Sequence, residues 1–274
     1  MITERGFKYT FRANPNNNQL GSASIEFLKD VQQRTGVQAK AVAVMTAQTA
    51  GGEAARKIWA DTLPKAGFNV VDNQSYPLTT TDFTSIIQRF KSRNVDLLLL
   101  VSNPNDAILI NRAMKQQDFN PIAFIGVVGG YYTSDYVQQL GKDADYTIVM
   151  NWFSPDLNLP NLKPLADKYK QRFNTDFDTT DATVANGVSV FVDAVERACS
   201  TDVERIRQAI QQTDMKVGQR WYVVPEGAKF DRNGQNIKQK VIGIQIRNGQ
   251  FVGVWPVEYA AGKLVWPIPA WKDR

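Results

Sequence analysis

The stretch AVAVMTAQTAGG, residues 41–52, places a short apolar run directly before a loop of small residues. After the loop, apolar side chains recur at the spacing of one helix face, at Ala55, Ile58, Trp59, Leu63 and Ala66. Gly67 follows at a position where helices commonly end. The pattern therefore predicts a strand, a tight loop and a helix, and Pro64 is expected to kink or shorten that helix.

Two further apolar segments extend this pattern into a sheet. Residues 68–71, FNVV, predict a second strand, and residues 96–101, DLLLLV, predict a strand that is buried on both faces. Between them lies a helix whose apolar face is formed by Phe83, Ile86, Ile87 and Phe90. Strands that alternate with helices in this way form parallel sheets covered by helices, so the expected fold class is α/β.

The same alternation continues to residue 151 and places three loops at one edge of the sheet. Residues 46–52, 102–106 and 126–132 each follow a predicted strand, and ligands of such sheets bind outside the carboxyl ends of the strands. The candidate ligand contacts are Gln48, Thr49, Ala50, Ser102, Asn103, Val128, Gly129 and Tyr131.

Each of these loops also has a purely structural interpretation. Residues 47–52 lack the glycine and lysine pattern of a phosphate-binding loop and fit a tight turn. Ser102, Asn103 and Asp106 are expected to cap a helix, with or without a ligand contact in addition. Tyr131 either stacks on a ligand or packs at the surface, and the sequence leaves both open.

The composition excludes several kinds of chemistry. The 274 residues include no histidine and one cysteine, Cys199, which excludes histidine-based nucleophiles, bases and metal sites, and an internal disulfide. The net charge of +5 is spread along the chain, which does not indicate a nucleic-acid partner. We expect no cofactor, no metal and no enzymatic activity, although an enzyme that works through carboxylates stays open.

A different organisation begins after residue 151. Residues 153–160 form a proline- and asparagine-rich crossing, the best candidate for a domain boundary. Three helices follow, and their expected buried faces contain Leu162, Leu165, Tyr169 and Phe173, then Val184, Val188, Phe191 and Val195, then Val203, Ile206 and Ile210. No parallel strand lies among them, so they have no sheet of their own to cover. Elsewhere, residues 7–12 alternate like a strand, and residues 241–255 predict a hairpin around an Asn-Gly turn.

In the order of these elements, the chain resembles the type I periplasmic solute-binding proteins of ABC transporters, and more narrowly their leucine/isoleucine/valine-binding branch. The resemblance rests on the order of the motifs over nearly the whole chain and not on any single motif. The matching segments are RGFKYTFR (5–12), residues 42–59, 76–83 and 124–126, DAVERA (193–198), FDRNG (230–234) and residues 248–256.

Members of that family have two lobes that trap a ligand between them. The resemblance implies a type I, two-lobed parallel-sheet fold in which residues 17–150 form a complete ligand-binding lobe, to which residues 235–260 return. Residues 151–234 are then the helical part of the other lobe, residues 1–16 a remnant of it with the hinge, and residues 261–274 a tail. It also implies a periplasmic location, an ABC permease as partner and a chain shortened at its amino end, because the parallel strands that normally precede the Arg5-Gly6-Phe7 segment in this family are absent. No secretory signal opens the sequence, so we expect the chain either to be cytosolic or to begin downstream of its natural start.

Three positions depart from the amino-acid binders of this family. Relatives often carry a tyrosine where this chain has Ala50, an acidic residue that grips an α-ammonium near Val128, and a tyrosine near Ala185. Because an ammonium without a carboxylate partner is costly to bury, the small organic ligand is either an amino acid or a carboxylate without the amine, such as an aromatic acid. An intracellular ligand-sensing module of the same fold is the remaining alternative.

Overall fold

The computed structural model describes residues 2–127 and 129–274, and the chain divides into two compact units. Unit 1 consists of Met1–Asn16, Trp152–Ile242 and Val257–Ala261. Unit 2 consists of Asn17–Asn151, Gly243–Pro256 and Gly262–Arg274. Among the helices of the described residues, none has the length and apolarity needed to cross a membrane.

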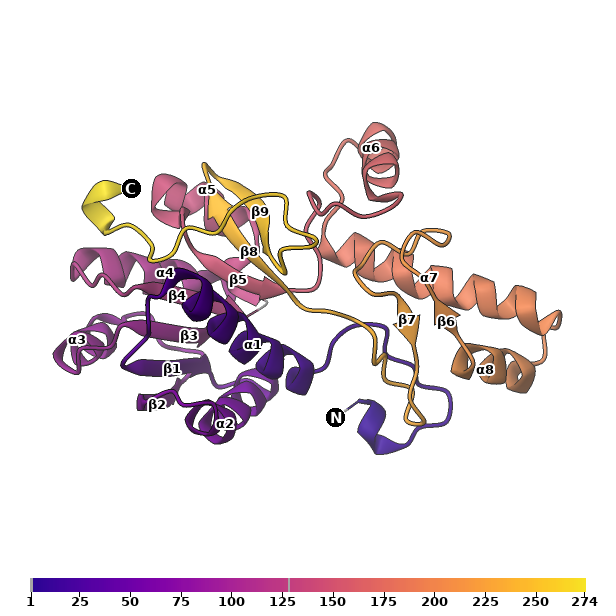
Figure 1. Ribbon diagram of the computed structural model, residues 1–274, viewed down its shortest axis with the longest axis horizontal. Coiled ribbons are helices and arrows are strands. Elements are labelled where there is room, and N and C mark those ends of the chain that lie inside the picture. The colour runs from indigo at the N-terminus through magenta and orange to yellow at the C-terminus, as the bar shows by residue number, and fades with distance from the viewer. Residues whose placement is uncertain (1, 128) are drawn as a thin grey trace. The chain divides into compact units, whose positions relative to one another are not determined.

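Unit 2 is built on a sheet of seven described strands in the order β2-β1-β3-β4-β5-β8-β9 (Figure 1). The strands β1 to β5 are parallel to their neighbours within this group. Their bounds are Val42–Ala47 for β1, Val70–Tyr76 for β2, Leu97–Val101 for β3, Ala123–Val127 for β4 and Ile148–Asn151 for β5. An antiparallel hairpin of β8 (Ile242–Arg247) and β9 (Gln250–Trp255) lies next to β5. The predicted α/β class with a parallel sheet is confirmed, and so is the hairpin.

The central strands form the core because their side chains are apolar on both faces. All six residues of β1 are buried, and the run of four leucines in β3 is fully buried between β1 and β4. A strand with this pattern is stable only where helices cover both faces of its sheet.

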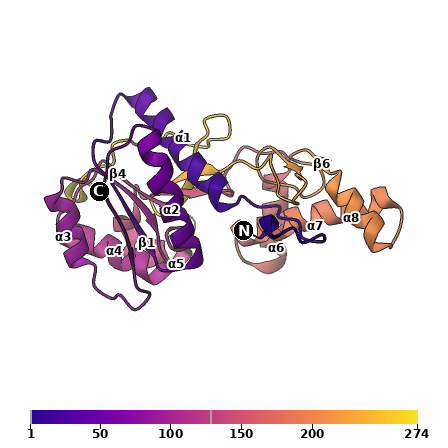
Figure 2. The same cartoon turned by 90° about the horizontal axis from the view of Figure 1, so that it is seen from below.

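Five α-helices of the described residues provide this cover. They are α1 (Asn17–Thr35), α2 (Ala50–Lys65), α3 (Thr84–Ser92), α4 (Pro104–Gln116) and α5 (Ser134–Leu140). α1 packs against α2, whereas α4 packs against α3 and α5 (Figure 2). With this strand order, right-handed crossovers place α2 on the face opposite α3, α4 and α5. Pro64 lies in the last turn of α2, which ends one residue later.

The last segment of the chain, expected as a tail, packs onto unit 2. The Ile268 amide donates to the Ile122 carbonyl at 2.9 Å, and the buried Trp271 indole donates its Nε1–H to the Phe119 carbonyl at 2.8 Å. The Arg274 guanidinium lies 3.7 Å from the centre of the Trp271 ring, and burial lowers the pKa of Arg274 to about 10. The segment is therefore part of the fold of unit 2.

Unit 1 is mainly helical. Its helices are α6 (Leu162–Phe173), α7 (Thr179–Ala198) and α8 (Val203–Gln211). Within the described part of this unit, the sheet is limited to an antiparallel pair of two-residue strands, β6 (Asp214–Met215) and β7 (Ala228–Lys229). The helices after the crossing thus have no large sheet beneath them, in agreement with the lack of strand patterns there.

The strand predicted at residues 7–12 is wrong. The segment contains only an isolated bridge between Arg12 and Gln235, and Phe7 and Tyr9 are exposed. Alternation of this kind produces a strand only where a neighbouring strand supplies hydrogen-bond partners and an apolar surface. Such a neighbour is missing from the described residues of unit 1.

The apolar face of α7 that was predicted to be buried is exposed instead. The residues concerned are Val184, Val188 and Phe191, with exposed fractions of 59%, 44% and 52%. The opposite face carries Asn186 and Ser189, whose oxygens accept backbone amides of residues 221–223 at 2.9 and 3.2 Å. The same correction applies to Phe173 and Val203, which are 55% and 64% exposed.

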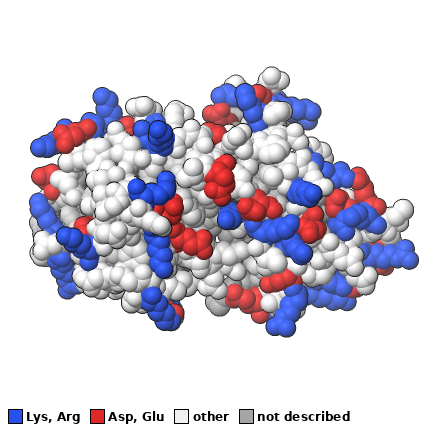
Figure 3. All heavy atoms as spheres, in the orientation of Figure 1, with Lys and Arg blue, Asp and Glu red and all other residues white. Residues whose placement is uncertain are grey.

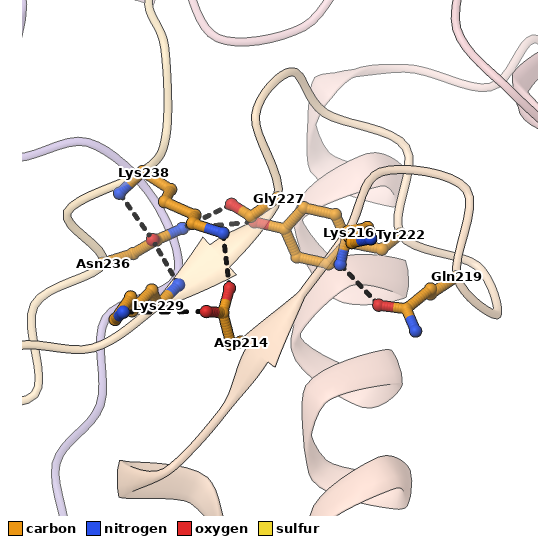
Figure 4. A network of polar contacts seen from close by, with 8 residues as sticks. All are labelled: Asp214, Lys216, Gln219, Tyr222, Gly227, Lys229, Asn236 and Lys238. Atoms are coloured by element: carbon orange, nitrogen blue, oxygen red, sulfur yellow. Dashed lines mark hydrogen bonds and ion pairs between the residues drawn. The ribbon is translucent and has the colours of Figure 1, made fainter.

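A buried asparagine joins distant segments of unit 1 (Figure 4). The side chain of Asn236 is fully buried. Its partners are Ala13, Tyr222, Gly227, Lys229 and Lys238. Its Nδ2 faces the oxygens of the first three at 3.1 to 3.2 Å, and its Oδ1 accepts the backbone amides of the two lysines at 3.0 and 3.1 Å. Beside it, ion pairs with the side chains of the same two lysines lower the pKa of Asp214.

Charged side chains are paired over the surface. In unit 1 the Glu204 carboxylate lies 2.7 Å from the Lys8 ammonium and 2.6 Å from the Arg207 guanidinium. Hydrogen bonds from Lys8 and Arg207 lower the pKa of Glu204 to about 2. On the face drawn in Figure 3, lysines and arginines lie interspersed with aspartates and glutamates.

Candidate ligand-binding site

The carboxyl ends of three neighbouring parallel strands meet at one edge of the unit 2 sheet. β1 and β4 flank β3, and in the paired register Thr46 lies beside Val101 and Leu100 beside Gly126. The loops that leave these strands therefore lie next to one another at this edge, where ligands of parallel sheets bind.

The loop between β1 and α2 is a tight turn that presents the amino end of a helix. The Thr49 hydroxyl caps α2 by accepting the Gly52 amide at 3.0 Å. A Cβ on Gly52 would lie 2.2 Å from the Ala47 carbonyl oxygen, so this turn requires glycine. Gln48 and Ala50 are exposed. The positive end of the α2 dipole is thus presented at this edge.

Ser102 and Asn103, which follow β3, have different roles. Ser102 is buried, and its Oγ lies 3.2 Å from the Tyr131 hydroxyl. Asn103 is exposed and occupies the N-cap position of α4, but its side chain makes no capping hydrogen bond, which corrects the prediction of a side-chain cap. Asn103 is therefore the exposed polar residue of this loop.

The loop after β4 packs its backbone directly onto the loop after β3. The Gly130 amide donates to the Ser102 carbonyl at 2.9 Å, and a Cβ on Gly130 would lie 2.4 Å from the Asn103 carbonyl oxygen. Gly129 is exposed, with a φ of +63°. Val128, also a predicted contact, lies outside the described residues. Only glycine at position 130 allows the two loops to approach this closely.

Beneath these loops lies a group of buried polar side chains, which we name the hydroxyl cluster: Tyr76, Ser102, Asp106 and Tyr131. The Tyr131 hydroxyl lies 3.2 Å from Ser102 Oγ, and the Tyr76 hydroxyl donates to Asp106 Oδ2 at 3.2 Å. A tyrosine phenol is already neutral at pH 7, and burial raises the pKa of Tyr76 and of Tyr131 further. The Tyr131 ring is fully buried, which corrects the expectation of a tyrosine at the surface of this edge.

The sequence did not single out Tyr76 as part of this edge. Tyr76 is the last residue of β2, pairs with Ala47 at the end of β1, and packs edge to face on Phe83 with ring centres 4.9 Å apart. The end of the strand could have indicated its place, because residues that end neighbouring parallel strands line up at one edge of the sheet.

The arrangement is suited to binding a ligand at this edge of the sheet. Among the predicted ligand contacts, the exposed residues are Gln48, Ala50, Asn103 and Gly129. Across residues 2–127 and 129–274, no three His, Cys, Asp or Glu side chains gather closely enough to hold a metal ion.

The comparison with protein families agrees with this architecture. The family described as periplasmic binding protein matches residues 2–250. The chain belongs to this family. The resemblance to type I periplasmic solute-binding proteins is therefore confirmed. The members of this family are receptors for solutes and not enzymes, and their location is extracytoplasmic.

This periplasmic binding protein is also similar to several individual proteins. A Leu/Ile/Val-binding protein homolog 7 from Brucella suis is 28% identical over 274 residues, which cover 97% of this chain and 68% of the relative. The leucine binding protein LivK from Thermotoga maritima has a TM-score of 0.77 at 20% identity over 91% of this chain and 68% of its own. A solute binding protein from R. palustris, solved with benzoate, has a TM-score of 0.71 at 15% identity over 95% and 66%. The solved structures share the fold.

Proposed function

We propose that this periplasmic binding protein is the solute receptor of an ABC transporter and delivers a small organic acid to a membrane permease from outside the cytoplasm. The observation that carries the proposal is the carboxyl edge of the unit 2 sheet, where Gln48, Ala50, Asn103 and Gly129 are exposed. The similar proteins are described as binding leucine, Leu/Ile/Val or benzoate, which supports a small organic ligand.

The amino end of α2 favours a carboxylate in the ligand. Thr49 already accepts the Gly52 amide, so the amides of Ala50 and Gly51 are the donors that a ligand oxygen would use. The partial positive charge at the amino end of a helix stabilises a nearby anion by about 0.3–1 kcal/mol. Backbone amides and the dipole act on the same anion, as in other helix-terminal anion sites.

The residue types at the edge disfavour an α-amino group. No acidic side chain occurs among the candidate contacts Gln48, Thr49, Ala50, Ser102, Asn103, Val128, Gly129 and Tyr131. A buried ammonium would lack a carboxylate partner from these residues, which is costly. The small side chain of Ala50 leaves room for a flat apolar group, and a protein of the same fold holds benzoate. We therefore favour an aromatic acid without an amine.

Calorimetric titration with benzoate and with leucine tests the ligand class. Ala50→Tyr is the informative variant and Ala60→Tyr its matched control, because both alanines are exposed on α2 and only Ala50 lies at the edge. We expect benzoate to bind the unmodified chain and the Ala60 variant, the Ala50 variant to bind at least about tenfold more weakly, and leucine to give no heat of binding.

Two results would count against the proposal. Tight binding of leucine together with no binding of benzoate would contradict the ligand class. An equal loss of benzoate affinity in the two tyrosine variants would contradict the placement of the ligand at the carboxyl edge.

A further inference from the structure

We propose that Tyr131, through its hydroxyl contact with Ser102, is a positioning residue that holds the ligand-facing loops of unit 2 in the arrangement that a ligand requires. This inference rests on the proposed function, because it concerns the same edge of the sheet. Both side chains are buried, so their role is to support the exposed residues and not to contact the ligand.

The loop after β4 contacts Ser102, in the loop after β3, at two points, one of them through Tyr131. Its hydroxyl lies 3.2 Å from Ser102 Oγ. The preceding residue, Gly130, donates its amide to the Ser102 carbonyl at 2.9 Å. Ser102 is thus held through both its side chain and its backbone, which fixes the next residue, Asn103, relative to the loop after β4.

The position of the Tyr131 ring is set by its surroundings. A Cβ on Gly126 in β4 would lie 2.3 Å from the nearest atom of the Tyr131 ring. The ring also lies edge to face against Tyr136, with centres 5.4 Å apart. Because the ring cannot shift toward β4 or toward Tyr136, its hydroxyl stays directed at Ser102.

The hydroxyl cluster also reaches the loop after β1. The Tyr76 hydroxyl donates to Asp106 Oδ2 at 3.2 Å, and Asp106 lies in the first turn of α4, directly after the loop that contains Ser102. The carbonyl of Tyr76 accepts the Gln48 amide at 2.9 Å. Tyr76 therefore connects the loop after β1 to the start of α4, while Ser102 and Tyr131 connect the other two loops.

The test compares Tyr131→Phe with Tyr136→Phe. Tyr136 is the matched control, since it is a fully buried tyrosine whose hydroxyl contacts Asn111 at 2.7 Å and Thr147 at 3.1 Å in place of the loop residues. Both variants remove one buried hydroxyl, and Tyr136→Phe, which loses two contacts, is expected to lower the melting temperature at least as much as Tyr131→Phe. Only Tyr131→Phe is expected to weaken benzoate binding, by about tenfold.

Hydrogen exchange without ligand provides a second measurement. We expect the Gly130 amide, which donates to the Ser102 carbonyl, to exchange about tenfold faster in Tyr131→Phe and at an unchanged rate in Tyr136→Phe. Ser102→Ala removes the same contact from the other side, and combining it with Tyr131→Phe should add little to either single effect.

The outcomes separate this inference from the proposed function. Equal effects of the two tyrosine variants on benzoate affinity, or unchanged Gly130 exchange in Tyr131→Phe, would overturn the positioning role. If the unmodified chain binds no benzoate, the proposed ligand class fails, and the hydrogen-exchange comparison still decides the positioning role.

Discussion

Replacing Asn236 with alanine removes the side chain that joins distant segments of unit 1. In the structure its Nδ2 faces Ala13, Tyr222 and Gly227, and its Oδ1 accepts the amides of two lysines. Alanine supplies no polar atom to replace the amide. Because the site is fully buried, water cannot reach every group that loses its hydrogen-bond partner.

The number of contacts sets the size of the effect. The amide nitrogen carries two hydrogens and the oxygen accepts two amides, so four of the five contacts count as full hydrogen bonds. Each contributes about 0.5–1.5 kcal/mol, and a buried group left unpaired costs about 1–3 kcal/mol. Because Lys229 lies at the surface, water can reach part of the network. We therefore expect a loss of about 3–4 kcal/mol.

Urea denaturation measures the loss of stability, and hydrogen exchange with mass spectrometry locates it. Residues 10–16 and 222–238 should exchange faster in Asn236→Ala, whereas the strands of unit 2 should keep their protection. Asn233→Ala is the matched control, because Asn233 is an exposed asparagine of the same loop and surface substitutions usually change stability by less than about 0.5 kcal/mol.

A loss below about 1 kcal/mol for Asn236→Ala, or faster exchange of the same peptides in Asn233→Ala, would refute this reasoning. Faster exchange in the strands of unit 2 would contradict the assignment of the network to unit 1.

Three further predictions follow from burial and charge. Phe191→Ala should change the free energy of unfolding by less than about 1 kcal/mol, because its ring is half exposed. Phe90→Ala should lower the free energy of unfolding by about 3–5 kcal/mol, because Phe90 is fully buried. Urea denaturation measures both changes, and equal losses would contradict the burial of Phe90. Trp271→Ala should lower the free energy of unfolding by about 3–5 kcal/mol in the same assay. An unchanged free energy of unfolding would mean that residues 261–274 form an unpacked tail. The lowered pKa of Glu204 contributes stability above about pH 4.5 that is lost as the pH falls toward about 2; circular dichroism should show a weaker acid dependence for Glu204→Gln, and an unchanged profile would contradict this.

The sheet of unit 2 could be predicted because the apolar pattern of each strand lies within the residues of that strand. A run of leucines such as that of β3 is stable only inside a covered sheet. The exposed face of α7 could not be predicted, because periodicity counts apolar residues and does not register polar partners. Asn186 and Ser189 face inward since each accepts a specific backbone amide from a distant loop, and this leaves Val184 and Phe191 outside.

The edge where the candidate loops meet could be predicted from the sequence, but the packing of these loops could not. The alternation of strands and helices located the loops that contain Gln48, Asn103 and Gly129 at one edge. The burial of Ser102 and Tyr131 depends on contacts between two loops of distant sequence, and no pattern within either loop encodes such a contact.

The claim that a ligand binds at the carboxyl edge of the unit 2 sheet is tested most directly by nuclear magnetic resonance. Benzoate is titrated into the ¹⁵N-labelled chain while the backbone amide signals are followed. We predict the largest shifts at Ala50, Gly51, Asn103 and Gly129, and little change at residues 36–40, which precede β1 at the opposite edge of the sheet. Saturable shifts centred on residues 36–40 or on the helices of unit 1, with the carboxyl edge unchanged, would contradict the claim.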